Sequence, residues 1–245
     1  MNTALKVILL IGVIGYLTFA IIKVQQENTV EDVTCTQLDV EFLDSVEEDF
    51  IEVSYIENLL AKHKISPEGQ RISQINLGTI EEVLAESPYV IQSNCYYTAD
   101  GKLCIQVTPR QPVLHVIADD DEYFLDRMGE CMPVGKFNPK LCVATGHVTR
   151  DFAHKQLTQL GIFIHDNKEW NELIEQIYVD RHNIISIYPK VGNQAIMLGD
   201  ATNYQDKFSR LALFYQEGLP KVGWNRYKTI NLAFDGQIVC TKADK

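Results

Sequence analysis

An apolar run near the N-terminus sets the first limit on how this chain can fold, because residues 7–22 (VILLIGVIGYLTFAII) include no charged side chain. With the flanking apolar residues and the aliphatic stems of two lysines, the segment reaches about 20 residues. That is enough for one membrane-spanning helix at about 1.5 Å per residue. We therefore predict a transmembrane helix at residues 7–24, with a short tail at 1–6 and a polar tether at 25–35.

The same segment is compatible with a cleaved secretory signal, since Thr18-Phe19-Ala20 places small residues where a signal peptidase requires them. The apolar run continues through Ile21 and Ile22, where a mature N-terminus is usually polar, so an uncleaved signal-anchor fits better. Either interpretation carries the body of the protein out of the cytosol. Because few residues precede the segment, we expect a cytoplasmic N-terminus and a translocated C-terminal part.

Charge is distributed unevenly along the 245 residues, whose formal net charge is −11. Residues 27–60 contain eleven acidic residues and no lysine or arginine, whereas residues 61–245 are nearly balanced. The acidity argues against nucleic-acid binding, which needs clustered basic residues. We hypothesise that the acidic segment is repelled by anionic lipid head groups and holds the first domain off the bilayer at low salt.

Hydrophobic periodicity indicates a small folded unit after the tether. Alternating apolar residues predict strands, and apolar residues at three- and four-residue spacing predict helices. The order is strand, helix, helix, strand, strand, at residues 37–44, 53–60, 75–84, 89–97 and 102–108. An Asp-Gly pair marks the turn between the last two strands. This order describes one small α+β unit.

The sequence PRQP at residues 109–112 marks a junction, because proline interrupts strand pairing. Beyond it we predict strands at 113–118, 122–126, 140–148, 176–179, 184–188, 195–198 and 229–241. A turn is predicted at 128–133, and helices at 150–160, 170–177 and 204–216, the last ended by Gly218 and Pro220. The fold class is therefore α+β, with a β-rich second domain and flanking helices.

Six cysteines are scattered through the chain without the CxxC or Cys–His spacing of a zinc site. Cys95 and Cys104 flank the turn at Asp100-Gly101 and would face each other only if the loop holds four residues. An oxidising compartment would permit disulfides. The favoured interpretation is that all six are small buried apolar residues, since a chain of this length does not need disulfides.

Sequence motifs for catalysis are absent: there is no GxSxG, HExxH, P-loop or GxGxxG, and the six histidines are not paired at helical spacing. The acidic run at 119–122 lacks the spaced ligands and glycine of a calcium loop, so a solvated turn is the better interpretation. We predict a binding protein without catalytic residues, cofactor or metal.

Residues 75–116 resemble the end of a POTRA domain of the bacterial cell-division family FtsQ/DivIB. The matching positions include Leu77, Ile80, Glu81, Leu84, Pro88-Tyr89-Val90, Leu103, Ile105, Val107, Arg110 and Pro112-Val113. Later matches, in the family's order, are Tyr123 to Asp126, Gly129, Met132-Pro133, Leu198-Gly199, Lys207 and INLAFDGQIV at 230–239. The chain departs from the family at Pro109, where an acid or Gln is common, and at Ala233, where Arg is common.

This resemblance implies a POTRA domain at residues 36–110 and a β domain at 111–245. It also implies a non-enzymatic divisome scaffold in the bacterial inner membrane, enriched at the septum, that links early and late division proteins. Its expected partners are other divisome members, including single-span proteins of the FtsB and FtsL type.

The resemblance places partner binding at the C-terminal strands of the β domain. An edge strand exposes unpaired N–H and C=O groups to which a partner strand can add. The expected contact residues on the closing strand are Leu232, Phe234, Gln237 and Val239, whereas Arg110 and Pro112 are expected to set the interdomain junction.

Two alternatives remain open on the sequence. A POTRA-containing protein of outer-membrane assembly or secretion would have tandem POTRA units or a membrane barrel. A membrane-anchored periplasmic hydrolase would have a clustered Ser or Asp/His site. Neither signature is visible in the sequence.

Overall fold

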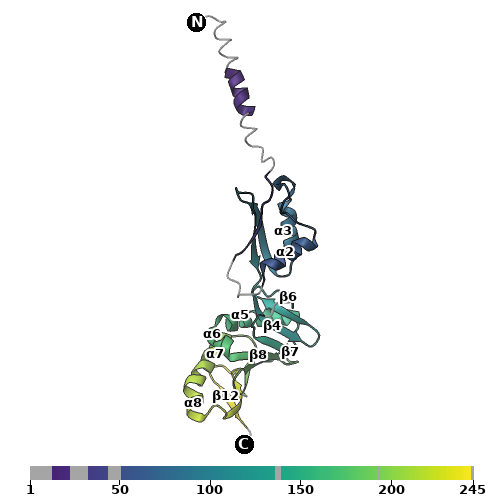
Figure 1. Ribbon diagram of the computed structural model, residues 1–245. Helices are drawn as coiled ribbons and strands as arrows, with labels where there is room; N and C mark the ends of the chain where they lie inside the picture. Colours follow the sequence, from purple (N-terminus) through teal and green to yellow (C-terminus); the bar gives the residue numbers. More distant parts are fainter. Residues whose placement is uncertain (1–12, 23–32, 44–50, 136–138, 193, 244–245) are drawn as a thin grey trace. The chain divides into compact units, whose positions relative to one another are not determined.

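The computed structural model describes residues 13–22, 33–43, 51–135, 139–192 and 194–243 (Figure 1). Residues 13–22 are helical. None of the helices within these described ranges combines the length and the hydropathy that a membrane span requires. The predicted span at 7–24 lies only partly within them and stays a prediction. The predicted tail at 1–6, most of the tether and much of the acidic segment lie outside the described residues.

The chain divides into two compact units, which are described separately. The first unit contains Val53–Ala85 and Ser93–Val107, together with the chain up to Glu41. The second contains Thr108–Lys245 and the segments Phe42–Glu52 and Glu86–Gln92.

Beyond the helix at residues 13–22, the first unit is a three-stranded sheet of order β1-β3-β2 with the two α-helices α2 and α3. Its elements are β1 (Leu38–Phe42), α2 (Val53–Lys62), η1 (Ile72–Gln74), α3 (Leu77–Ala85), β2 (Val90–Tyr97) and β3 (Leu103–Pro109). The predicted order is confirmed. Leu103, Ile105 and Val107 are fully buried and alternate with more exposed residues, as expected for a strand with one face on a core. Ile56 and Leu84 complete this core from the two helices.

The second unit is built on a nine-stranded sheet of order β12-β11-β10-β9-β8-β7-β4-β5-β6. The strands are β4 (Pro112–Ala118), β5 (Glu122–Asp126), β6 (Cys131–Pro133), β7 (Val143–Gly146), β8 (Ile174–Val179), β9 (Ile185–Pro189), β10 (Ala195–Gly199), β11 (Tyr227–Asn231) and β12 (Val239–Lys242). The pairs β4–β7, β7–β8 and β10–β11 are parallel, and the other pairs are antiparallel. Mixed pairing of this kind places long crossover connections beside short hairpins.

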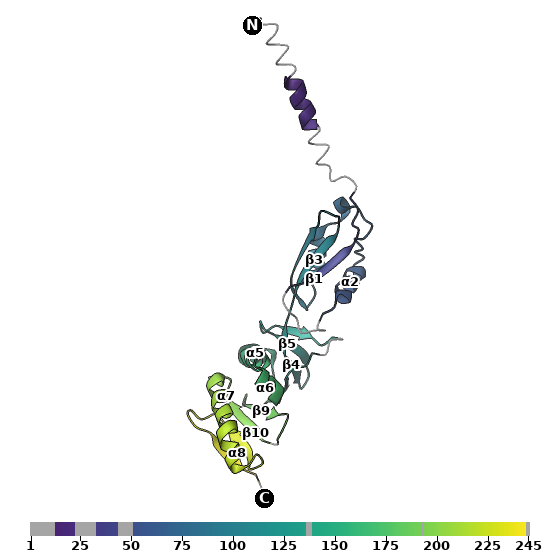
Figure 2. The same cartoon turned by 60° about the vertical axis from the view of Figure 1, so that its left-hand side comes forward.

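Two helical crossovers connect the parallel pairs β7–β8 and β10–β11. The first contains α4 (Arg150–Phe152), the π-helical turn η2 (Ala153–Leu157), α5 (Thr158–Asp166) and α6 (Lys168–Leu173). The second contains α7 (Tyr204–Leu213), the π-helical turn η3 (Phe214–Gly218) and α8 (Leu219–Val222). Figures 1 and 2 show these helices along one face of the sheet.

One apolar core lies between these helices and the sheet. It joins helix residues such as Leu160 and Leu211 to strand residues such as Ile177 and Ile196, all 1% exposed or less. The ring of Phe208 on α7 packs edge-on against Trp170, with centroids 4.9 Å apart. The two crossovers are therefore fixed to each other as well as to the sheet.

The predicted helix at 170–177 is wrong beyond Leu173, where β8 begins. The pairing of β8 with β9 shifts register between Ile174 and Gln176. As a result Ile174 and Ile177 are both buried, and their three-residue spacing imitates a helix. The predicted turn at 128–133 is also partly wrong, because its last three residues form β6.

The predicted end of the helix starting at Tyr204 is wrong as well. The helical segment continues through η3 and α8 to Val222. Pro220 stands in the first turn of α8, where a missing N–H and a fixed φ are tolerated. Gly218 and Pro220 therefore mark a change from π-helical to α-helical hydrogen bonding and not the end of the helical segment.

All six cysteines are free thiols. Cys35, Cys95 and Cys142 are buried as predicted, whereas Cys104, Cys131 and Cys240 are half-buried. Burial raises the pKa of the Cys142 thiol to about 12, so this thiol stays protonated at neutral pH.

Candidate partner-binding edge

The C-terminal sequence forms two strands rather than the single strand predicted at 229–241. β11 ends at Asn231, a loop follows, and β12 returns antiparallel with Asn231 opposite Val239. We call residues 232–238 the closing loop. The Asp235-Gly236 pair supplies the turn, and Gly236 has φ 66°, a left-handed conformation that favours glycine.

Strand β12 is one edge of the nine-stranded sheet, and among the described residues it pairs with β11 alone. The amide of Ala243 donates to the carbonyl oxygen of Arg226 at 3.0 Å, on the β11 side. Because successive backbone groups of a strand point to opposite sides, the N–H and C=O groups of Cys240 and Lys242 point away from β11. These two residues form the open hydrogen-bonding edge.

The four expected contact residues are placed in different ways. Leu232 is 0% exposed and its amide donates to the carbonyl oxygen of Met197 in β10 at 2.9 Å. Phe234 and Gln237 lie exposed in the closing loop, and Phe234 is 49% exposed. Val239 begins β12 and is 45% exposed. Three of the four side chains are therefore accessible, and Leu232 belongs to the core.

Arg210 on α7 holds the closing loop and was not recognised from the sequence. Its Nη1 donates to the carbonyl oxygens of Phe234 at 3.0 Å and Gln237 at 2.6 Å, and its Nη2 donates to that of Leu232 at 3.2 Å. Its Nε donates to a carboxylate oxygen of Asp206 at 2.9 Å. One guanidinium thus binds the backbone at three of the four expected contact residues.

A groove of about 360 Å³ lies between the helical segment formed by the end of α7 and η3 and the closing loop. Its wall is largely apolar, and it is lined by Arg210, Leu213, Phe214, Glu217, Gly218, Gly236, Gln237 and Ile238. Leu213 is 61% exposed beside it. Exposed apolar side chains near an unpaired strand edge are typical of a surface that receives a partner.

Arg110 and Pro112, expected at the interdomain junction, lie at the start of the second unit. Arg110 Nη1 donates to Asp126 Oδ2 at 2.8 Å, and this carboxylate is 1% exposed. Asp126 Oδ1 accepts the amides of Met128 and Glu130, both at 2.8 Å. Arg110 therefore neutralises the buried carboxylate that shapes the turn before β6. Its expected role at the junction stays a prediction.

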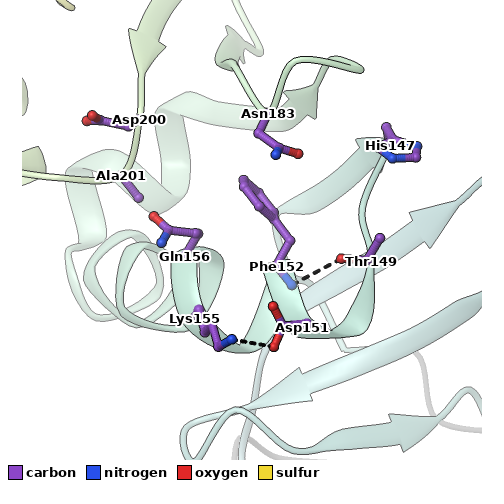
Figure 3. Close-up of a pocket in the computed structure, with 9 residues that line it drawn as sticks. All are labelled: His147, Thr149, Asp151, Phe152, Lys155, Gln156, Asn183, Asp200 and Ala201. Carbon is purple, nitrogen blue, oxygen red and sulfur yellow. Dashed lines mark hydrogen bonds and ion pairs between the residues drawn. The ribbon is translucent and has the colours of Figure 1, made fainter.

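A pocket of about 470 Å³ with a mixed polar and apolar lining lies where the loops after β7, β8 and β10 converge (Figure 3). Lys155 pairs with Asp151 at 2.7 Å, and the hydroxyl of Thr149 accepts the amide of Phe152. Hydrogen bonds from Thr202 and Lys207 lower the pKa of the Asp200 carboxyl to about 2. These acidic groups are thus engaged in local structure. Among the described residues, no group of three or more His, Cys, Asp or Glu side chains could hold a metal ion.

Comparison with known proteins gives two matches along the chain. Residues 33–108 match a POTRA-like domain, and residues 111–241 match the domain described as FtsQ/DivIB, C-terminal related. No match was found among curated proteins. The second match covers more than half of the 245 residues and includes both β11 and the closing loop. The chain therefore belongs to the FtsQ/DivIB family of cell-division proteins.

Proposed function

We propose that this protein is a non-enzymatic divisome scaffold, which links early and late division proteins by adding a partner strand to β12. The observation that carries the proposal is the open edge of β12 in a domain that matches the FtsQ/DivIB family. The match at 111–241 also favours this function over an outer-membrane assembly protein or a periplasmic hydrolase. Domains of these families are typically non-catalytic.

Strand addition is favoured because the outward N–H and C=O groups of Cys240 and Lys242 have no strand beside them in the described structure. Pairing with a partner strand would satisfy these groups and extend the sheet by one strand. Val239 and Phe234 would supply apolar contact beside the new ladder, and Gln237 would supply polar contact. Leu232 would support the loop from the core without contacting the partner.

The proposed partners are single-span divisome proteins of the FtsB and FtsL type. We further propose that residues 7–24 anchor the chain in the inner membrane, with both folded units in the periplasm and enrichment at the septum. Support for this arrangement is the apolar, uncharged run at residues 7–22.

The proposal is tested by replacing Lys242 with proline in the full-length protein and recovering partners from solubilised membranes. Proline removes one outward N–H while leaving the β11 side intact, a position where edge strands tolerate it. Lys242→Ala is the matched control, because it removes the same side chain and keeps the N–H. We expect Lys242→Pro to lower recovery of the FtsB-type partner about tenfold relative to Lys242→Ala.

Equal recovery of the partner by the two variants would refute strand addition at β12. Cell morphology gives a separate test of the division role. Depletion of the protein should produce filaments without septa, and normal division with envelope leakage would contradict the proposal.

A further inference from the structure

Strand β12 is weakly anchored by its own side chains. Of its four residues only Cys240 packs against the core, and it is half-buried, whereas Val239, Thr241 and Lys242 are exposed. Its pairing with β11 also shifts register between Tyr227 and Thr229. Little apolar area is therefore buried by β12, and its position must depend on other contacts.

The closing loop supplies those contacts through the half-buried side chain of Ile238, which packs against the core, and through its backbone. Buried Leu232 fixes the loop where it leaves β11. The carbonyl of Gln237, two residues before β12, accepts the shortest of the three carbonyl bonds from Arg210, at 2.6 Å. Between these points the carbonyl of Phe234 accepts another bond from the same guanidinium. The loop is thus held at both ends by groups outside its own strands.

We infer that Arg210 is a positioning residue, which fixes the closing loop and so holds β12 where a partner strand can add to it. This inference rests on the proposed function. Arginine suits the task because its planar guanidinium presents several donors in a rigid fork, whereas lysine presents one compact ammonium. Arg210 itself is largely covered, with 15% of its side chain exposed.

Asp206 orients the guanidinium group of Arg210. It lies one turn before Arg210 on α7 and accepts the bond from Nε, which leaves both Nη atoms facing the loop. Its own side chain is 65% exposed. Because the carboxylate side of this ion pair is exposed, water screens the attraction and the pair contributes little to stability. The carbonyl bonds, rather than the ion pair, should therefore control the loop.

The effect of Arg210 should be local, because the loop around Phe234 and Gln237 is exposed to water. Carbonyl groups released there can bind water instead of remaining unsatisfied. Loss of Arg210 should therefore mobilise the loop and β12 without unfolding the core around Phe208. If Arg210 only stabilised the fold as a whole, its loss would loosen the closing loop, β12 and the core around Phe208 together.

Hydrogen exchange of the purified full-length protein in detergent tests the inference without a partner. In Arg210→Ala and Arg210→Lys we expect the amides of Val239, Thr241 and Ala243, which face β11, to exchange about tenfold faster, with rates at 111–199 unchanged. Asp206→Asn and Arg150→Ala are controls. The first keeps a side-chain oxygen that can accept the bond from Nε and removes only the negative charge. The second removes an exposed arginine bound to Asp121, so both should exchange as the wild type does. Unchanged exchange in Arg210→Ala, or wild-type exchange in Arg210→Lys, would overturn the inference.

Recovery of the FtsB-type partner from membranes provides the second measurement. We expect Arg210→Lys to recover several-fold less partner than Asp206→Asn. Faster exchange with undiminished recovery would overturn the positioning role. If the wild-type protein itself recovers no such partner, the proposed function fails, while the exchange experiment still decides whether Arg210 holds β12. If Arg210→Ala does not fold, Arg210→Lys, which keeps the charge, supplies both measurements.

Discussion

The two edges of the nine-stranded sheet are built differently. At one edge β6 has three residues, its central Met132 is 0% exposed, and it ends in Pro133. The hydroxyl of Tyr89 donates to the carbonyl oxygen of Pro133 at 3.1 Å. At the other edge β12 has four residues, three of them exposed, and outward groups at Cys240 and Lys242.

This difference indicates which edge can receive a partner. Proline has no N–H to donate, and a short edge strand with an engaged carbonyl offers little backbone for pairing. At β12 the inward side is paired with β11 and Arg210 binds the closing loop that precedes the strand, while the outward side is open. The β6 edge of the sheet therefore offers little backbone to a partner strand, whereas the β12 edge has outward backbone groups without a neighbouring strand in the described structure.

The largest effect on stability is expected at Leu232, because this residue of the closing loop belongs to the core, whereas Phe234 lies on the surface. Leu232→Ala should lower the free energy of unfolding of the second unit by about 3 kcal/mol, because it leaves a cavity at a fully buried position. Phe234→Ala should lower it by less than about 1 kcal/mol, since Phe234 is 49% exposed. Urea titration of both variants provides the measurement, and equal losses would contradict the assignment.

A smaller effect is expected at the β6 edge. Tyr89→Phe removes the hydroxyl that donates to Pro133 and should lower the free energy of unfolding by about 1 kcal/mol. It should not create a binding edge, because Pro133 still lacks an N–H. The check is thermal unfolding combined with partner recovery from membranes. Tighter partner binding in this variant would show that the β6 edge also takes part.

The smallest effect is expected at Asp200, which precedes α7 and pairs with Lys207 at 2.9 Å. The pKa of its carboxyl is lowered to about 2, first by the Thr202 hydroxyl and then by Lys207. Because folding lowers this pKa, the ionised carboxylate stabilises the folded state at pH values above the ordinary carboxyl pKa. That contribution is lost as the pH falls toward about 2.

Asp200→Asn should therefore cost about 0.5 kcal/mol at pH 7, a small value because the carboxyl is mostly exposed and screened by water. The difference from wild type should shrink as the pH is lowered from 4 toward about 2. Denaturant titrations across this range provide the test. A difference that stays constant with pH would assign the effect to side-chain shape rather than charge.

Local patterns in the sequence predicted much of the fold. The alternation of Leu103, Ile105 and Val107 identified β3, and apolar residues at three- and four-residue spacing identified α2 and α3. The pattern failed at Ile174, where a register shift in the sheet imitates helical spacing. Register shifts arise from pairing with a distant strand, which a single local window does not contain.

The candidate edge was predicted only in part, for the same reason. Leu232 and Phe234 alternate as if on one strand, but one is buried against β10 and the other lies exposed in a loop. Arg210 carried no signal, because it is separated from the carbonyls it binds by 22 to 27 positions. Such contacts are set by how α7 packs on the sheet, which the sequence pattern does not reveal.

Residue-resolved hydrogen exchange of the protein with and without its co-purified partner tests the central claim most directly. Strand addition predicts that the amides of Cys240 and Lys242 exchange slowly in the complex, whereas the amides of β6 exchange as they do in the free protein. Protection confined to other surfaces, with Cys240 and Lys242 unchanged, would contradict the proposal that the partner adds to β12.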